Sequence, residues 1–469
     1  MPHPAPHVTL TTGTIAGAAT GGIRRFLGIR YAEPPFGERR FATPVPAAPW
    51  QGVREATRFG PTAPQSPYQG ESATLLSSVE IPGDDILTVN VWAPEDAVGL
   101  PVVVWVHGGA LERGTAALEG YDGTTFARDG IVFVSVNYRL GAEGFSILDG
   151  APRNLGLLDV VTAVEWVFRE IHAFGGDAGR VTLMGESAGG ALVAAAMTLP
   201  RIGDRAYGAI IQSGPLDASS PERSGRVTRA VAKHLGIPAT RDAFAAVSPQ
   251  ELVDARLELA RNSSPLSGAS FALALDPATL PRPIDAALAD VAAPILIGTN
   301  TDEYRLWLSP SAIAALGPLK VASLALAMRV PFRAVRAARA AGFPGGEALG
   351  QAVGDKILRA PATRLAHARP NCTFVYEFAW QSPVRDLRAA HAVEIAFAFG
   401  RLDGPDALAL SGADAPQSLA DEMHRTWVSF ITTGDPGWPS FGPSRTTRIF
   451  DTESRTTPQR RTEVVDALR

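Results

Sequence analysis

Short, almost continuously apolar runs recur along this chain, and segments with helical periodicity separate them. Because helices cover both faces of a parallel sheet, its strands lack the polar–apolar alternation of half-exposed strands. The segment 156–171, GLLDVVTAVEWVFREI, instead carries apolar residues at helical spacing. The alternation predicts an α/β fold, with a central, mostly parallel sheet and helices on both faces. The predicted strands are 102–106, 131–136, 181–184, 209–212, 295–297 and 372–379.

No linker divides the chain, so we expect a single domain over residues 1–469. α/β folds of this length often form one unit. Residues 8–17, VTLTTGTIAG, predict an antiparallel hairpin added at one edge of the sheet. The segments 217–290 and 310–350 lack strong strand signals. We expect them to be helical insertions over the strand ends, forming a cap or gorge wall.

Composition and charge argue against several classes of function. A formal net charge of −4 gives no basis for binding nucleic acid or an anionic membrane surface. The apolar stretch 321–332 is interrupted by Arg329 and Pro331 and is too short to span a bilayer. The N-terminus lacks the basic start and apolar stretch of a secretory signal, so we expect a cytoplasmic protein. One cysteine, Cys372, permits neither an intramolecular disulfide nor a cysteine metal cluster.

The stretch 183-LMGESAGGALV-193 places Ser187 between glycines, after a predicted strand and before a run of small residues that begins a helix. This context is typical of a nucleophile elbow, a tight turn that lifts a serine hydroxyl above a sheet. The alternative is a structural turn that only tolerates glycine. The five-residue pattern occurs once in the chain, and its flanks favour the nucleophile.

A serine hydroxyl needs a base, usually histidine, and a carboxylate to orient that base. In α/β-hydrolases both follow the serine in the chain. Of the later histidines, His391 alone follows a predicted strand on a loop, whereas His234 precedes most of the later sheet and His367 and His424 lie in helical patterns. For the acid, Asp302 and Glu303 both lie just past the predicted strand 295–297, and position does not choose between them.

An oxyanion hole needs backbone N–H donors near the nucleophile. The predicted strand 102–106 ends in 107-HGGALERG-114, where glycines would let the backbone approach a substrate carbonyl. The alternative is an ordinary glycine turn.

Several ordered blocks, taken together, resemble the type-B carboxylesterases, which include bacterial para-nitrobenzyl-type esterases and cholinesterases. The resemblance runs through most of the chain and implies an α/β-hydrolase fold. The blocks are 27-LGIRYAEPPFGERRF-41, 83-GDDILTVNVWAP-94, 107-HGGA-110, 136-VNYRLGAEGF-145, 154-NLGLLD-159, 174-FGGDAGRVTLMGESAGG-190, 298-GTNTDE-303, 391-HAVEIAFAFG-400 and 427-WVSFITTGDP-436.

The resemblance implies roles that position alone leaves open. It makes Glu303 the acid, with His391 as the base. It assigns the oxyanion donors to the backbone N–H groups of Gly109, Ala110 and Ala188.

The resemblance also implies residues around the triad and in the scaffold. Ser213 would lie close to the triad, and Glu186 would either tune the histidine electrostatically or serve as a buried structural carboxylate. Two structural ion pairs are implied, Arg40 with Asp84 and Arg139 with Asp159.

The chain also departs from the family pattern. Residues 84–87 read DDIL where the family has a disulfide cysteine. The loop 61–83 has no tryptophan, which removes the physical basis for a quaternary-ammonium preference. Leu111 stands where an aromatic residue is common, which would widen the pocket.

Together these features predict a serine carboxylesterase that hydrolyses neutral short to medium acyl or aryl esters through an acyl-enzyme. Its partner is a small-molecule ester, with no nucleic acid, membrane, cofactor or metal; the oligomeric state stays open, a monomer included. The alternatives are a non-catalytic binding protein of the same fold and a hydrolase of carbamates, amides or thioesters. Candidate pocket residues, whose alternative is ordinary core, are Leu111, Leu216, Phe271, Leu306, Trp307 and Phe397.

Overall fold

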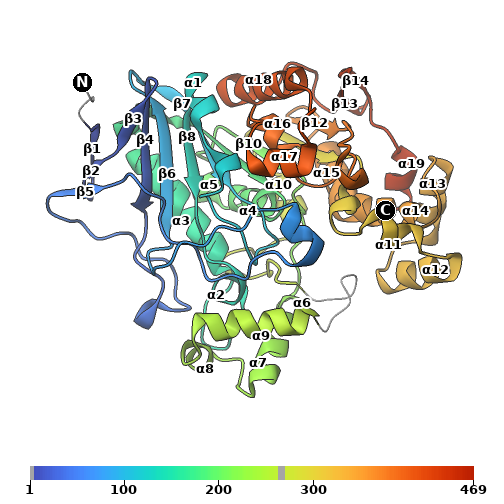
Figure 1. Ribbon diagram of the computed structural model, residues 1–469, viewed down its shortest axis with the longest axis horizontal. Helices are drawn as coiled ribbons and strands as arrows, with labels where there is room; N and C mark the ends of the chain where they lie inside the picture. Colours follow the sequence, from blue (N-terminus) through green and yellow to red (C-terminus); the bar gives the residue numbers. More distant parts are fainter. Residues whose placement is uncertain (1–4, 262–269, 469) are drawn as a thin grey trace.

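The computed structural model describes residues 5–261 and 270–468, and in this part of the chain eleven strands form one central sheet (Figure 1). The predicted domain 1–469 and insertion 217–290 therefore include residues that lie outside the description. In spatial order the strands are β14 (Arg455–Pro458), β13 (Thr446–Phe450), β12 (Thr373–Phe378), β11 (Ile295–Asn300), β10 (Gly208–Gln212), β9 (Gly176–Glu186), β7 (Leu100–Val106), β8 (Val132–Val136), β6 (Thr88–Pro94), β4 (Ile23–Arg30) and β3 (Ala18–Thr20).

The strands from β13 to β8 are parallel, which confirms the predicted mostly parallel sheet. Antiparallel strands close both ends, with β14 at one and β6, β4 and β3 at the other. The six predicted strands correspond to β7 through β12. In the centre Val104 lies opposite Val134 on one neighbour and Leu183 on the other, so the apolar runs pair with one another.

The N-terminal hairpin is present but lies elsewhere than predicted. Strands β1 (His7–Leu10) and β2 (Gly13–Ala16) are antiparallel. They form a separate three-stranded sheet with β5 (Val53–Glu55), because the second edge of β2 pairs with β5. The prediction that the hairpin extends the main sheet is therefore wrong, and β3 forms that edge.

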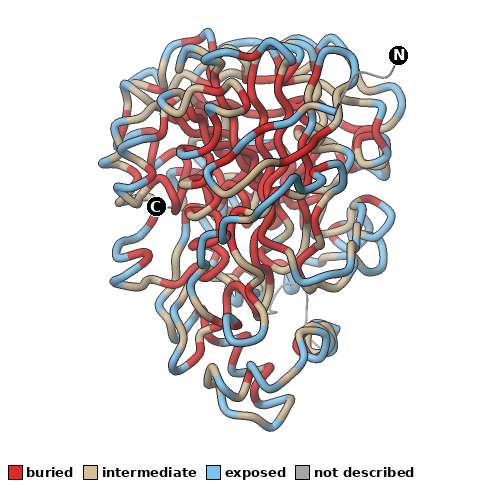
Figure 2. Tube along the Cα trace, turned by 90° about the vertical axis from the view of Figure 1, so that its left-hand side faces the viewer, coloured by how far each residue is buried: buried red, intermediate tan, exposed pale blue. Residues whose placement is uncertain are grey.

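Two hydrophobic cores lie on opposite faces of the sheet. Side chains alternate along a strand, so Val102, Val104 and Val106 face one core and Val103 and Trp105 the other. The first core includes α3 (Leu155–Glu170) and α4 (Ala188–Met197); the second includes α1 (Thr124–Arg128), α16 (Ile395–Ala398) and α18 (Gln417–Thr433). Figure 2 shows the buried strands in the centre of the molecule, with the exposed chain around them.

Both segments predicted as insertions contain helices; in Figure 1, α6 to α9 lie at the bottom of the molecule, α11 to α14 at its right-hand side and α10 near its centre. The first segment has α6 (Pro221–Ser224), α7 (Arg226–Leu235), α8 (Arg241–Ala245), α9 (Pro249–Arg261) and α10 (Ile284–Leu288); the second has α11 (Pro310–Ala314), α12 (Pro318–Ala327), α13 (Phe332–Ala340) and α14 (Gly345–Gly354). The remaining helices are α2 (Gly141–Phe145), α5 (Pro200–Gly203), α15 (Ala360–Ala368), α17 (Pro405–Ser411) and α19 (Thr462–Asp466). Helices α12, α13 and α14 share a small core of their own with α19.

One of the two predicted ion pairs is present. Arg139 and Asp159 form a buried bidentate pair, with Nη2–Oδ1 at 2.7 Å and Nε–Oδ2 at 2.8 Å. The pairing of Arg40 with Asp84 is wrong: buried Arg40 pairs with Glu143 of α2, with Nη2–Oε1 at 2.5 Å. Asp84 lies on an exposed loop, whereas the Arg40 guanidinium is buried and needs a buried carboxylate.

Candidate active site

Ser187 lies at the sharp turn between β9 and α4. Its backbone has φ 55° and ψ −123°, a conformation that is uncommon for a residue with a side chain. The turn is tight because a Cβ on Gly189 would lie 2.0 Å from the carbonyl oxygen of Val106. The Ser187 N–H donates to the Gln212 carbonyl at 2.8 Å, which ties the turn to β10. The local geometry is that of a nucleophile elbow.

His391 and Glu303 meet on the loops that follow β12 and β11. His391 Nδ1 lies 2.6 Å from Glu303 Oε2, and both side chains are buried. The other oxygen of Glu303 accepts from the Ser213 hydroxyl at 2.6 Å and from the Asn300 N–H at 2.7 Å. Asp302 turns away, with its carboxylate 4.0 Å from Arg305 Nε. Of the two acids that position left open, the fold brings Glu303 to the histidine.

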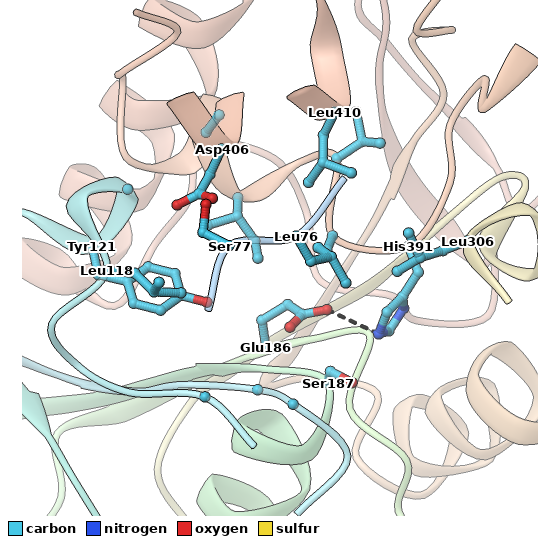
Figure 3. Close-up of a pocket in the computed structure, with 18 of the residues that line it drawn as sticks. Leu76, Ser77, Leu118, Tyr121, Glu186, Ser187, Leu306, His391, Asp406 and Leu410 are labelled. Atoms are coloured by element: carbon cyan, nitrogen blue, oxygen red, sulfur yellow. Dashed lines mark ion pairs between the residues drawn. The ribbon is translucent and has the colours of Figure 1, made fainter. Parts of the chain in front are cut away.

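Glu186 contacts the second ring nitrogen of His391. Its Oε1 lies 3.0 Å from Nε2, and Figure 3 shows both side chains in the same pocket as Ser187. Burial raises the pKa of Glu186 to about 8, against the opposing charge of His391. Burial lowers the pKa of His391, but the carboxylates of Glu186 and Glu303 outweigh this and raise it to about 9. The imidazole is thus held between two acids that favour its protonated form.

The loop after β7 lies directly against the nucleophile. A Cβ on Gly108 would lie 2.5 Å from Glu186 Oε2 and 3.2 Å from the Cβ of Ser187. Gly109 has φ 116°, and a Cβ there would lie 2.0 Å from the Arg113 carbonyl oxygen. The approach of this loop to Ser187 therefore depends on glycine at Gly108, and the fold of the loop itself on glycine at Gly109.

A cavity of about 290 Å³ opens above these groups. Its lining includes Ser187, Glu186 and His391, together with Leu306 and Trp307, two of the predicted pocket residues. The Trp307 ring lies 4.9 Å from the His391 ring, between centroids. The rest of the lining comes mainly from residues 68–77, 108–121 and 392–410. Substrate-sized space is thus next to the proposed nucleophile.

The sequence of residues 4–317 matches the family model described as the carboxylesterase family. The chain is 34% identical to the para-nitrobenzyl esterase of Bacillus subtilis (strain 168), over 95% of each chain. The chain belongs to the carboxylesterase family. It is also 33% identical to the phenmedipham hydrolase of Pseudarthrobacter oxydans, over 93% of each chain. A solved structure of a thermophilic PNB esterase matches with a TM-score of 0.88 and 31% identity, covering 99% of this chain and 100% of that one.

The family assignment makes the protein a carboxylesterase-family hydrolase with the α/β-hydrolase fold. The fold prediction and the resemblance to type-B carboxylesterases are thereby confirmed.

Four predicted pocket residues of this carboxylesterase do not line the cavity. Leu111 and Leu216 are buried in the core beside α3 and α4. Phe271 lines a separate, smaller pocket. Phe397 packs against Phe378 and Trp380, with ring centroids 5.0 and 5.1 Å apart. Leu111, Leu216 and Phe397 are thus packed in the interior, and Phe271 lies at a different pocket.

Several functional candidates were missed at the sequence level. Tyr68 and Tyr121 line the cavity, as does Asp406 of α17. The resemblance directs attention to the loop 61–83, which carries Tyr68, but no sequence pattern marks Asp406. The contribution of α17 depends on how a distant part of the chain packs beside residues 119–121.

The described residues are 5–261 and 270–468. They contain no group of three or more His, Cys, Asp or Glu side chains placed to hold a metal ion. None of their helices combines the length and apolar character needed to cross a bilayer.

Proposed function

We propose that this carboxylesterase-family hydrolase cleaves neutral carboxylic esters with short to medium acyl or aryl groups, through an acyl-enzyme on Ser187. The observation that carries the proposal is the 2.6 Å contact of Glu303 with His391 Nδ1, in the cavity that also holds the strained Ser187 turn. A buried carboxylate on Nδ1 fixes the tautomer in which Nε2 acts as the base, and Glu186 Oε1 lies 3.0 Å from that Nε2.

The reaction proceeds in two balanced halves. Ser187 Oγ attacks the ester carbonyl carbon while His391 Nε2 takes the hydroxyl proton. The tetrahedral intermediate then collapses, and the alcohol leaves with the proton returned by His391. Water repeats the sequence on the acyl-enzyme, which releases the carboxylic acid and restores Ser187. Glu303 accepts the hydrogen bond from Nδ1 and stabilises the imidazolium in both halves.

The oxyanion of each tetrahedral intermediate would be bound by the backbone N–H groups of Gly109, Ala110 and Ala188. The close approach of the glycine loop to Ser187 supports this role. Ala188 is also the first residue of the ten-residue helix α4, whose positive end favours developing negative charge. The scheme requires neither a metal ion nor an organic cofactor.

The character of the cavity supports the substrate class. Leu76, Leu118, Leu306 and Leu410 give it apolar walls around the catalytic groups. Pockets with this balance bind mostly apolar ligands and orient them through a few polar groups. A volume of about 290 Å³ suits small esters better than long-chain ones.

The test is hydrolysis of para-nitrophenyl esters from acetate to octanoate by the wild type, Ser187→Ala and Ser72→Ala. Ser72 lines the same cavity and serves as the matched serine control. We expect Ser187→Ala to lose at least about a thousandfold in kcat while Ser72→Ala stays near wild type. Circular dichroism checks that all three are folded. Folded wild type without turnover, or undiminished turnover by Ser187→Ala, would overturn the proposal.

A further inference from the structure

Asp406 lines the substrate cavity, and its Oδ1 has no hydrogen-bond partner among the described residues. Asp406 belongs to the first turn of α17 and is one of the lining residues. Its Oδ1 is buried and has no hydrogen-bond partner among the described residues. Figure 3 shows this carboxylate across the pocket from Ser187, with Leu76 and Ser77 drawn between them. Gly404, the N-cap residue of α17, has no side chain to cap the helix, and Asp406 lies in the first turn.

The two guanidinium groups that line the cavity are engaged by other residues. Arg401 lies 3.6 Å from Asp122, 3.8 Å from Glu119 and 3.9 Å from Asp403. Arg113 lies over the Tyr68 ring, 5.1 Å from its centroid. Neither forms an ion pair with Asp406 within the described chain. The negative charge at this end of the cavity is therefore available to a ligand.

Two phenol rings lie within the field of Asp406. Burial raises the pKa of Tyr68 to about 12, and the charges of Glu186 and Asp406 add to the effect while Arg113 opposes it. Burial also raises the pKa of Tyr121, again with contributions from Glu186 and Asp406. Both rings thus stay neutral near neutral pH and frame the carboxylate with aromatic surface.

We propose that Asp406 is a specificity residue that binds a protonated amine, or another N–H donor, carried by the ester substrate. The proposal rests on the proposed function and narrows its substrate class. The ester carbonyl would lie at Ser187 and the N–H group at Asp406, with the apolar walls between them. A primary ammonium fits because it has N–H donors for a carboxylate, whereas a quaternary ammonium has none.

The preference for an N–H donor follows from the cost of leaving the buried Asp406 oxygen without a hydrogen bond. A buried carboxylate oxygen without a hydrogen bond is unfavourable, and a ligand N–H removes that penalty. A neutral analogue of the same shape leaves the oxygen unpaired. Sites built to hydrogen-bond a substrate group therefore discriminate strongly against analogues that lack it.

Two matched ester pairs test the proposal and determine which side of the ester carries the donor. For the alcohol side, para-(aminomethyl)phenyl butanoate is compared with para-ethylphenyl butanoate. For the acyl side, phenyl para-(aminomethyl)benzoate is compared with phenyl para-ethylbenzoate. We expect the wild type to prefer the ammonium ester in at least one pair, by about tenfold in kcat/KM.

The variant Asp406→Asn keeps the shape and removes the charge. We expect it to lose about tenfold on the preferred ammonium ester and to hydrolyse the neutral ester within about twofold of wild type. The matched control is Asp403→Asn, whose carboxylate is 84% exposed, three residues earlier in the chain. It should behave as wild type on both esters.

The outcomes separate the two proposals. If the neutral esters are hydrolysed in a Ser187-dependent way but Asp406→Asn changes both members of a pair equally, or neither, the Asp406 proposal fails alone. If no ester is hydrolysed, the proposed function fails, and calorimetry with benzylammonium then tests the subsite without turnover. We expect Asp406→Asn to weaken that binding about tenfold. Equal binding of benzylammonium by both proteins would overturn the proposal.

Discussion

The two sides of the active-site cavity are built in different ways. One side, which we term the catalytic wall, is lined by residues 306–307 and 391–393, with Glu303 directly behind His391. The opposite side, the facing wall, comprises residues 68–77 and 401–410 and carries Asp406 (Figure 3). The catalytic wall is held by a buried network of hydrogen bonds, whereas residues 68–77 of the facing wall are held mainly by contacts within their own loop.

The network behind the catalytic wall reaches deep into the sheet. Asn300 donates to the Ala390 carbonyl at 2.7 Å and to Glu394 at 2.5 Å. Glu394 also accepts from Gln212, which in turn accepts from the Trp427 indole at 3.0 Å. Because each of these groups is buried, a displaced partner would leave a polar atom unsatisfied. The positions of Glu303 and His391 are thus fixed by more contacts than their own.

The facing wall shows the opposite character. In residues 68–80 most side chains are exposed or half-buried, and only Leu75 is buried. The Tyr68 N–H donates to the Ser78 hydroxyl and the Thr74 hydroxyl to the Glu71 carbonyl, both within the same loop. Such a wall can change sequence without disturbing the triad. The comparison teaches that the catalytic side chains of this hydrolase are held rigidly, whereas the loop of residues 68–80 on the facing wall can vary.

Substitution of Arg305 should have the largest effect on the catalytic wall. Its side chain is 1% exposed and binds Asp386 Oδ2 at 2.7 Å and Glu347 Oε1 at 2.8 Å. It thereby joins the loop of Glu303 to the loop of His391. We expect Arg305→Met to lower the free energy of unfolding by about 2–4 kcal/mol, because two carboxylates lose a buried partner. We also expect kcat to fall at least about tenfold with little change in KM.

The matched control for Arg305→Met is Arg282→Met. Arg282 pairs with Asp290 at 2.6 Å, but the two side chains are 55% and 68% exposed. Exposed pairs contribute little, so this variant should stay within about 1 kcal/mol of wild type. Thermal melts measure the change in stability, and steady-state kinetics on para-nitrophenyl butanoate measure kcat and KM. An Arg305→Met enzyme with wild-type kcat would show that the catalytic wall does not depend on this link.

Glu186 tests the electrostatics rather than the rigidity of the same wall. His391 must be neutral to accept the serine proton, and its pKa of about 9 lies above the ordinary value. The wild-type kcat/KM should therefore rise as pH increases through the neutral range toward that pKa. Glu186→Gln removes a carboxylate that lies 3.0 Å from His391 Nε2, and this lowers the pKa of His391. We expect the acid limb of the profile to move to lower pH by about one unit.

The pH profile distinguishes this electrostatic role from a structural one. A purely structural effect of Glu186→Gln would lower activity without moving the limb. Glu71→Gln, on the exposed part of the facing wall, is the charge-matched control and should leave the limb in place. A limb that stays unmoved in Glu186→Gln would show that Glu186 does not set the protonation of His391.

The contrast between the walls also explains what the sequence predicts and what it does not. Strands β7 to β12 are predictable because each is a continuous apolar run, and the Ser187 turn because its glycines are required by backbone contacts within about 3 Å. The sequence places Asp302 and Glu303 equally well, and only the turn after β11 directs Glu303 toward His391. Asp406 reaches the cavity through packing of a distant helix, which no local pattern encodes.

The same reasoning accounts for the two scaffold errors. The partner of Arg40 is Glu143, on a helix about a hundred residues away, and burial rather than family position decides the pair. The first hairpin pairs with β5 rather than with the main sheet, because strand partners depend on long-range contacts. Periodicity predicts that a strand exists, but not which edge it joins.

Trp307 gives the smallest and most specific test, on the catalytic wall beside His391. It lines the cavity beside His391, yet it is 42% exposed, so its removal leaves a wider opening rather than a buried hole. We expect Trp307→Ala to change the relative kcat/KM for acetate and octanoate esters by about threefold to tenfold, with little loss of stability. The matched control is Phe332→Ala, since Phe332 is 54% exposed and lies outside the cavity. An unchanged chain-length profile in Trp307→Ala would remove this ring from the substrate-binding surface and leave acyl selection to the facing wall.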